Sequence, residues 1–172
     1  MDMDVSPPPE PLKFEEQSDG TIRLEATQWI QRPLEEVFRF FSQPENLHAL
    51  TPTRMNVELL TTTPVDMRAG RQLTYRLRVK GLPIRWTSQI VRWDPPHSFR
   101  DIQLKGPYRK WDHTHRFERD GCGTRVIDDV RYSAPGPRWM ERAWIRPDVR
   151  KIFQYRHRTL EGVFRAGVPN LA

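Results

Sequence analysis

The sequence predicts one α+β domain, in which an antiparallel sheet of about seven strands is followed by a long C-terminal helix. Three observations lead to this expectation. Apolar and polar residues alternate through much of 56–133, which is typical of strands with one buried face. Apolar residues recur at helical spacing over 147–165. A chain of 172 residues is also long enough for one domain with a substantial core.

The fold is expected to begin near Thr21 with a strand and then a helix. Residues 22–30 alternate in polarity, and Pro33 follows at a position that suits the first turn of a helix. Residues 42–44 end that helix, and a second short helix is predicted over 45–50. The first helix places four apolar residues on one face: Leu34, Val37, Phe38 and Phe41.

Four further strands are predicted before residue 106. They lie at 57–60, 73–79, 84–90 and 98–105, between turns rich in Gly and Pro. The inward face of the last strand stays open, because large residues occur at both parities. One set is Phe99, Asp101 and Gln103, and the other is Ile102 and Leu104.

The last two strands form a hairpin whose register can be predicted. Residues 120–123 read Asp-Gly-Cys-Gly, which is typical of a tight turn. Closing the hairpin there places His115 opposite Asp128 and puts an apolar row with two histidines on the inner face: Trp111, His113, His115 and Phe117. The same register creates two opposite-charge pairs outside: Glu118 with Arg125, and Asp112 with Arg131.

A helix is expected to close the chain. Pro147 is predicted to start it, Gly167 lies just beyond its end, and its length of about 28 Å is enough to cross a sheet. The preceding amphipathic segment, 138–145, is expected to cap one end of the sheet. The apolar stripe of the long helix consists of Val149, Ile152, Phe153, Leu160, Val163 and Phe164.

Composition sets limits on the remaining segments and on the compartment. Residues 1–20 are acidic and Pro-rich and are predicted to be a flexible tail, 21–167 the domain, and 168–172 a short C-terminal tail. Cys122 is the one cysteine, so no intrachain disulfide is expected. Because neither a signal peptide nor a long apolar run is evident, a cytoplasmic location is expected.

The order of strand, helix, short helix, meander and long helix resembles the START-like helix-grip superfamily over about residues 21–165. Individual residues resemble a bacterial stand-alone subgroup of polyketide cyclase/dehydrase-like (SRPBCC) proteins: Gly106, Pro107, Tyr108, Trp111, His113, His115, Phe117, Gly123, Thr124, Asp128 and Tyr132. The resemblance implies a curved sheet wrapped around the C-terminal helix. It also implies a cavity between them for a lipid, polyketide or similar apolar molecule.

Within that cavity, the hairpin residues are the candidate site. If the protein is an enzyme, His115 oriented by Asp128 is the candidate general base, with His113 or Tyr132 assisting at a carbonyl. The alternative is that the pair only satisfies its own polar groups or orients a ligand. The expected ligand-binding residues are Trp111, His113, His115, Phe117, Asp128, Tyr132, Tyr75, Trp86 and Phe153.

A metal and any other cofactor are not expected. His113, His115 and Asp128 match a catalytic zinc set in number, but histidines two apart on a strand are common without metal, and no further His or Cys ligand is evident. Cys122 lies in a turn and is expected to be an inert thiol. The other histidines, His48, His97 and His157, are expected to be ordinary surface or edge residues.

A rival hypothesis rests on charge. The net charge is +6, the chain after residue 20 carries about +11, and 23 of the 28 basic residues are arginine. Such a face suits nucleic acid or an anionic membrane, although no nucleic-acid motif accompanies it. Transient membrane contact is compatible with the ligand-binding hypothesis, and nucleic acid is disfavoured. The basic residues concerned are Arg76, Arg78, Lys80, Arg85, Arg142, Arg146, Arg150, Lys151, Arg156 and Arg158.

Overall fold

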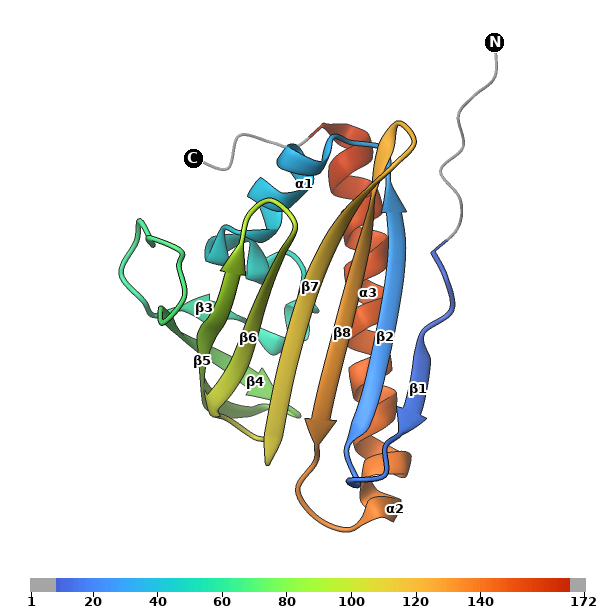
Figure 1. Ribbon diagram of the computed structural model, residues 1–172. Helices are drawn as coiled ribbons and strands as arrows, with labels where there is room; N and C mark the ends of the chain where they lie inside the picture. The colour runs from blue at the N-terminus through green and yellow to red at the C-terminus, as the bar shows by residue number, and fades with distance from the viewer. Residues whose placement is uncertain (1–8, 168–172) are drawn as a thin grey trace.

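The computed structural model describes residues 9–167 and shows a curved antiparallel sheet with a long helix packed along one face (Figure 1). Within those residues the sheet has eight strands in the order β1-β2-β8-β7-β6-β5-β4-β3. This is the predicted helix-grip α+β fold, with one strand more than the sequence indicates.

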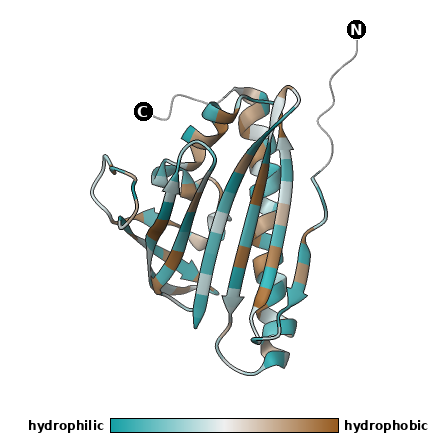
Figure 2. Ribbon diagram, in the orientation of Figure 1, coloured by the Kyte–Doolittle hydropathy of each residue, from teal (hydrophilic) through white to brown (hydrophobic). Residues whose placement is uncertain are grey.

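The strands are β1 (Lys13–Glu16), β2 (Ile22–Ile30), β3 (Glu58–Leu59), β4 (Gln72–Val79), β5 (Leu82–Asp94), β6 (Ser98–Lys105), β7 (Lys110–Asp120) and β8 (Gly123–Ser133). The helical elements are α1 (Leu34–Phe41), the 3₁₀ turns η1 (Pro44–His48) and η2 (Thr53–Met55), α2 (Arg138–Met140), the π-helical turn η3 (Glu141–Ile145) and α3 (Arg146–Ala166). Hydrophobic and hydrophilic residues alternate along the strands, as expected for a sheet with one covered face (Figure 2).

The additional strand, β1, corrects the prediction of a loose tail over residues 1–20. It pairs with β2, and Phe14 packs against the core while the guanidinium of Arg150 lies 4.6 Å from its ring centroid. Glu16 accepts hydrogen bonds from three arginines of the C-terminal helical region: Arg138, Arg142 and Arg146. The prediction is therefore wrong for Lys13–Glu16, because these side chains have partners far away in the sequence. The predicted tail residues 1–8 and 168–172 lie outside the described part.

The register of the β7–β8 hairpin is confirmed. His115 lies opposite Asp128, Glu118 opposite Arg125, and Asp112 opposite Arg131. The ionic contacts on the outer face differ from the predicted pairs, however. Asp112 accepts two hydrogen bonds of 2.7 and 2.6 Å from Arg100 of β6, and Arg125 donates to Asp120 at 2.7 Å.

The structure also settles which face of β6 points inward. Phe99 is buried and Asp101 faces the interior, whereas Leu104 is 44% exposed. The ring of Phe99 packs against four aromatic side chains, so its burial outweighs that of the smaller Ile102 and Leu104. Those neighbours are Phe38, Trp93, His115 and Phe117.

The C-terminal helix is longer than predicted. Helical structure already begins at Arg138 and passes through η3. The long helix α3 begins at Arg146, with Pro147 in its first turn as predicted, and continues to Ala166. The π-helical turn ends at Ile145, and Pro147 follows in the first turn of α3, where a residue without an N–H is tolerated. The helical structure is therefore continuous from residue 138 to residue 166.

Candidate functional site

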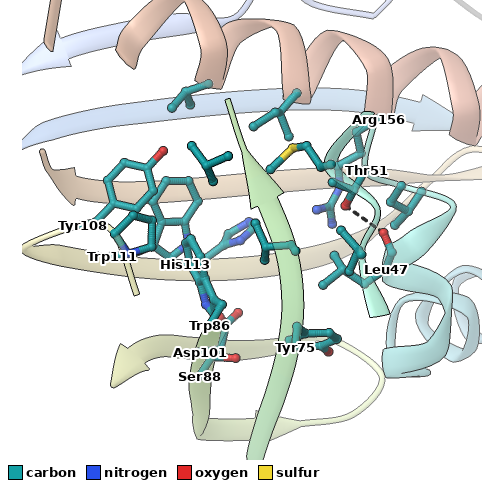
Figure 3. Close-up of a pocket in the computed structure, with 18 of the residues that line it drawn as sticks. Leu47, Thr51, Tyr75, Trp86, Ser88, Asp101, Tyr108, Trp111, His113 and Arg156 are labelled. Carbon is teal, nitrogen blue, oxygen red and sulfur yellow. Dashed lines mark hydrogen bonds between the residues drawn. The ribbon is translucent and has the colours of Figure 1, made fainter. Parts of the chain in front are cut away.

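A cavity of about 620 Å³ lies between the inner face of the sheet and the helices (Figure 3). Its wall comes from α1, the 3₁₀ turns, β4–β7 and the C-terminal helices. Most of the lining is apolar or aromatic, including Leu73, Leu77, Ile90, Val149 and Ile152. Such a cavity has the size and character of a small-molecule site, which is usually apolar with a few convergent polar groups.

One wall of the cavity is polar, and three neighbouring strands and α3 build it. Strand alternation directs both His113 and His115 of β7 inward, and the flanking strands bring Asp101 opposite His113 and Asp128 opposite His115. Arg156 reaches the same group from α3. Asp101, His113 and Arg156 are seen together along the cavity in Figure 3.

Asp128 is the centre of this cluster. Its Oδ1 accepts a hydrogen bond of 2.9 Å from Nε2 of His113 and lies 2.8 Å from Nδ1 of His115. Its Oδ2 lies 3.4 Å from Nε of Arg156. Burial would raise the pKa of Asp128, but Arg156 and the two imidazoles outweigh it and hold the pKa well below its usual range. Asp128 is therefore a buried carboxylate anion.

The two histidines have different protonation tendencies although they are neighbours. Burial, together with the adjacent His115, lowers the pKa of His113. Burial also acts to lower the pKa of His115, but Asp101 and Asp128 outweigh it and raise the pKa above its ordinary value. Nε2 of His115 lies 3.4 Å from Oδ2 of Asp101, so this ring is held between two carboxylates.

The structure places the predicted ligand-binding residues in two groups. Six line the cavity: Tyr75, Trp86, Trp111, His113, His115 and Phe153. Phe117, Asp128 and Tyr132 are buried and do not line it. Asp128 therefore contacts the two histidine rings and not the cavity. The hydroxyl of Tyr132 donates a hydrogen bond of 2.7 Å to Oε1 of Glu141. The catalytic roles of His115, Asp128 and His113 stay predictions.

Two members of the polar wall are not evident from the sequence. The charge pattern places Arg156 on a basic surface, but this residue is buried, because it provides the counter-charge for Asp128. Asp101 is not singled out, because both parities of β6 are plausible. One signal for Arg156 is its place beside the apolar stripe of the helix, three residues after Phe153.

The remaining histidines and Cys122 lie away from the cavity wall. His48 and His97 are exposed, as predicted, but His157 is buried, and that prediction is wrong. It lies on the face of α3 that packs against β2, where its carbonyl accepts a hydrogen bond of 2.9 Å from Gln28. Cys122 is exposed in the hairpin turn.

Among residues 9–167, no helix is long and apolar enough to cross a membrane.

Comparisons with known proteins agree with this architecture. A family model described as polyketide cyclase/dehydrase and lipid transport matches residues 21–165. No curated protein matches the sequence.

Several solved structures have the same fold. Protein Ms6760 from Mycobacterium smegmatis is 16% identical, with 92% of this chain and 99% of that one covered and a TM-score of 0.69. TTHA0849 from Thermus thermophilus is 21% identical, with 86% and 99% covered and a TM-score of 0.66. Major latex-like protein 151 from Panax ginseng is 14% identical, with 87% and 99% covered and a TM-score of 0.64.

Proposed function

Because the chain belongs to the polyketide cyclase/dehydrase and lipid transport family, we propose that it binds a hydrophobic small molecule, such as a lipid or polyketide, between the sheet and α3. The observation that carries the proposal is the cavity of about 620 Å³ with its mainly apolar lining. A volume of this size can enclose most of a drug-sized ligand, and burial of the ligand's apolar surface drives binding.

The polar wall supports a ligand that is not purely hydrocarbon. His113, His115 and Arg156 line one side of the cavity and offer hydrogen-bond donors and acceptors beside its apolar lining. A ligand with one polar group directed toward this wall would satisfy both regions. The predicted anchoring role of Asp128 is then indirect, because it orients the two histidine rings.

The rival hypothesis of a basic interaction surface has less support, because several of its residues are already paired. Arg156 is buried against Asp128. Other members have acidic partners: Arg76 with Glu58, Lys80 with Asp148, Arg142 with Glu16, and Arg146 with Glu141. These pairs reduce the uncompensated positive charge that a phosphate-rich partner would meet. Transient membrane contact stays a prediction.

The proposal is tested by looking for a bound molecule and then blocking the space. Native mass spectrometry of the purified protein should show a co-purified small molecule, and the neutral dye Nile red should bind saturably. Ser88 is buried and lines the cavity, so Ser88→Phe should weaken Nile red binding at least about tenfold. Arg85→Phe places the same ring on the exposed outer face of β5 and is the matched control.

Two results would overturn the proposal. One is a wild-type protein that carries no small molecule and binds no Nile red. The other is a folded Ser88→Phe variant that binds the dye as tightly as Arg85→Phe. Salt-sensitive binding to DNA or anionic vesicles, combined with either result, would favour the basic interaction surface instead.

A further inference from the structure

We propose that Asp101, His113 and His115 form a site for a divalent transition-metal ion on the polar wall of the cavity. Each of these residues offers one ligand atom, and the three atoms lie within 4.8 Å of one another. Two imidazoles and one carboxylate are a donor set that Zn²⁺ and neighbouring first-row ions accept. The sequence suggests Asp128 as the third ligand beside the two histidines. In the folded protein Asp101 takes that position instead.

Asp101 and His115 lie close together on neighbouring strands. Oδ2 of Asp101 and Nε2 of His115 are 3.4 Å apart. Two ligand atoms that each lie about 2.0–2.1 Å from a tetrahedral Zn²⁺ are about 3.3 Å from each other. This pair therefore already has the spacing of two metal ligands. His113 offers a third ligand atom, within 4.8 Å of a ligand atom of each partner.

Asp128 lies behind both imidazole rings and does not itself line the cavity. Oδ1 of Asp128 contacts Nε2 of His113 and Nδ1 of His115, so the second nitrogen of His115, Nε2, faces Asp101. Metal-binding histidines usually donate their second ring N–H to a carboxylate or carbonyl, which fixes the tautomer and orients the ring. Phe99 adds to this by stacking on His115 at 4.1 Å between centroids. One carboxylate thus prepares both imidazoles for the same ion.

The charges of the cluster are unequal in number. With neutral imidazoles, the cluster contains two carboxylates, Asp101 and Asp128, and one cation, Arg156. The guanidinium lies beside Asp128, and its Nη2 is 3.4 Å from Nδ1 of His115. Asp101 instead has its ion-pair contact with Nε2 of His115, so a metal ion between these two atoms would take over the charge compensation of the carboxylate.

The location adds a chemical consequence. All three proposed ligands line the cavity, so an ion held by them keeps at least one coordination position open to it. Water or an oxygen atom of a cavity ligand would complete the coordination sphere. Metal binding itself needs no apolar ligand, so it is measured separately from the function proposed above.

The test uses the full chain without an affinity tag, after dialysis against a chelator. Titration with Zn²⁺ in a calorimeter should show one equivalent bound, and Co²⁺ should give the intense visible absorption of a four-coordinate site. Asp101→Asn and His115→Ala should each weaken Zn²⁺ binding at least about 100-fold. Asp128→Asn should weaken it about 10- to 100-fold by releasing the rings. Circular dichroism verifies that each variant is folded.

The control variant is His48→Ala combined with His97→Ala, which removes two exposed imidazoles and should leave Zn²⁺ affinity unchanged. The proposal fails if the wild-type protein binds no stoichiometric Zn²⁺. It also fails if the near-isosteric Asp101→Asn variant binds as tightly as the wild type, or if the control variant abolishes binding. In those cases the cluster is an ion-paired polar wall without metal, and the ligand-binding proposal is unaffected.

Discussion

His115 and Asp128 are direct partners across the β7–β8 hairpin, and Nδ1 of the imidazole lies 2.8 Å from Oδ1 of the carboxylate. Both side chains are almost completely buried. The hairpin turn, a local feature, sets the register that brings the two residues together. His115 also lines the cavity, which is built from segments far apart in the sequence. The buried carboxylate of this pair is stabilised by groups from other elements, above all by Arg156 of α3.

Replacing the central carboxylate should be strongly destabilising. Asp128→Ala leaves the buried guanidinium of Arg156 without its counter-ion and should lower the free energy of unfolding by about 3–5 kcal/mol. Urea denaturation followed by circular dichroism measures this loss. Asp94→Asn is the control, because Asp94 is an exposed partner of Arg92 and its loss should cost less than about 1 kcal/mol. Equal losses in the two variants would contradict the central role of Asp128.

The hydroxyl of Tyr132 should contribute to stability through the C-terminal helix. It donates to Glu141, which also accepts hydrogen bonds from Arg146, so this contact ties β8 to the π-helical turn. Tyr132→Phe should reduce the free energy of unfolding by about 1.5–3 kcal/mol, as expected for a buried hydrogen bond to a charged acceptor. Tyr155→Phe is the comparison and should change it by less than about 0.5 kcal/mol. A Tyr132→Phe variant as stable as the wild type would show that the contact contributes nothing.

The turn between β4 and β5 should control how fast a molecule exchanges with the cavity. Nζ of Lys80 lies 3.7 Å from Oδ2 of Asp148 and 5.6 Å from the ring centroid of Trp144, and all three residues line the cavity. Lys80→Met removes both attractions, each worth up to about 1 kcal/mol, and should speed Nile red release a few-fold. Stopped-flow displacement measures the rate. Lys105→Met serves as the control, and equal rates in both variants would exclude a role for this contact.

His157 should make stability depend on pH. Burial lowers its pKa, and Arg156 lowers it further while Asp128 raises it, with a net lowering. The unfolded chain takes up a proton near the ordinary histidine pKa of about 6.5, whereas the folded protein does so only at lower pH. Stability is thus lost as the pH falls below about 6.5.

A His157→Gln variant should therefore lose less stability than the wild type between about pH 7 and pH 5. Urea denaturation at several pH values gives the two curves. Because His113 and His115 are present in both proteins, the difference between the curves reports on position 157. Parallel curves would mean that the neutral state of His157 contributes nothing to folding.

Short-range patterns predicted the parts of the fold that short-range interactions determine. The period of α1 follows from apolar residues three and four positions apart, and the hairpin register follows from the turn at Gly121. Partners that are distant in sequence could not be predicted in this way. Sequence alternation does not predict the edge strand β1, because its side chains pair with residues far away in the chain: Arg150 and the arginines around Glu16. A charge count likewise did not separate buried Arg156 from surface arginines.

The candidate site shows the same division. Strand alternation and a tight turn were enough to place His113, His115 and Asp128 on one side of the hairpin, because these residues are close in the chain and their geometry repeats every two positions. Asp101 belongs to this cluster because its side of β6 faces inward, and Arg156 belongs to it because α3 packs across the sheet. The inward face of β6 depends on the burial of Phe99 among aromatic side chains. The position of Arg156 depends on charge compensation for the buried carboxylate of Asp128. Both are long-range free energies, which a linear pattern does not contain.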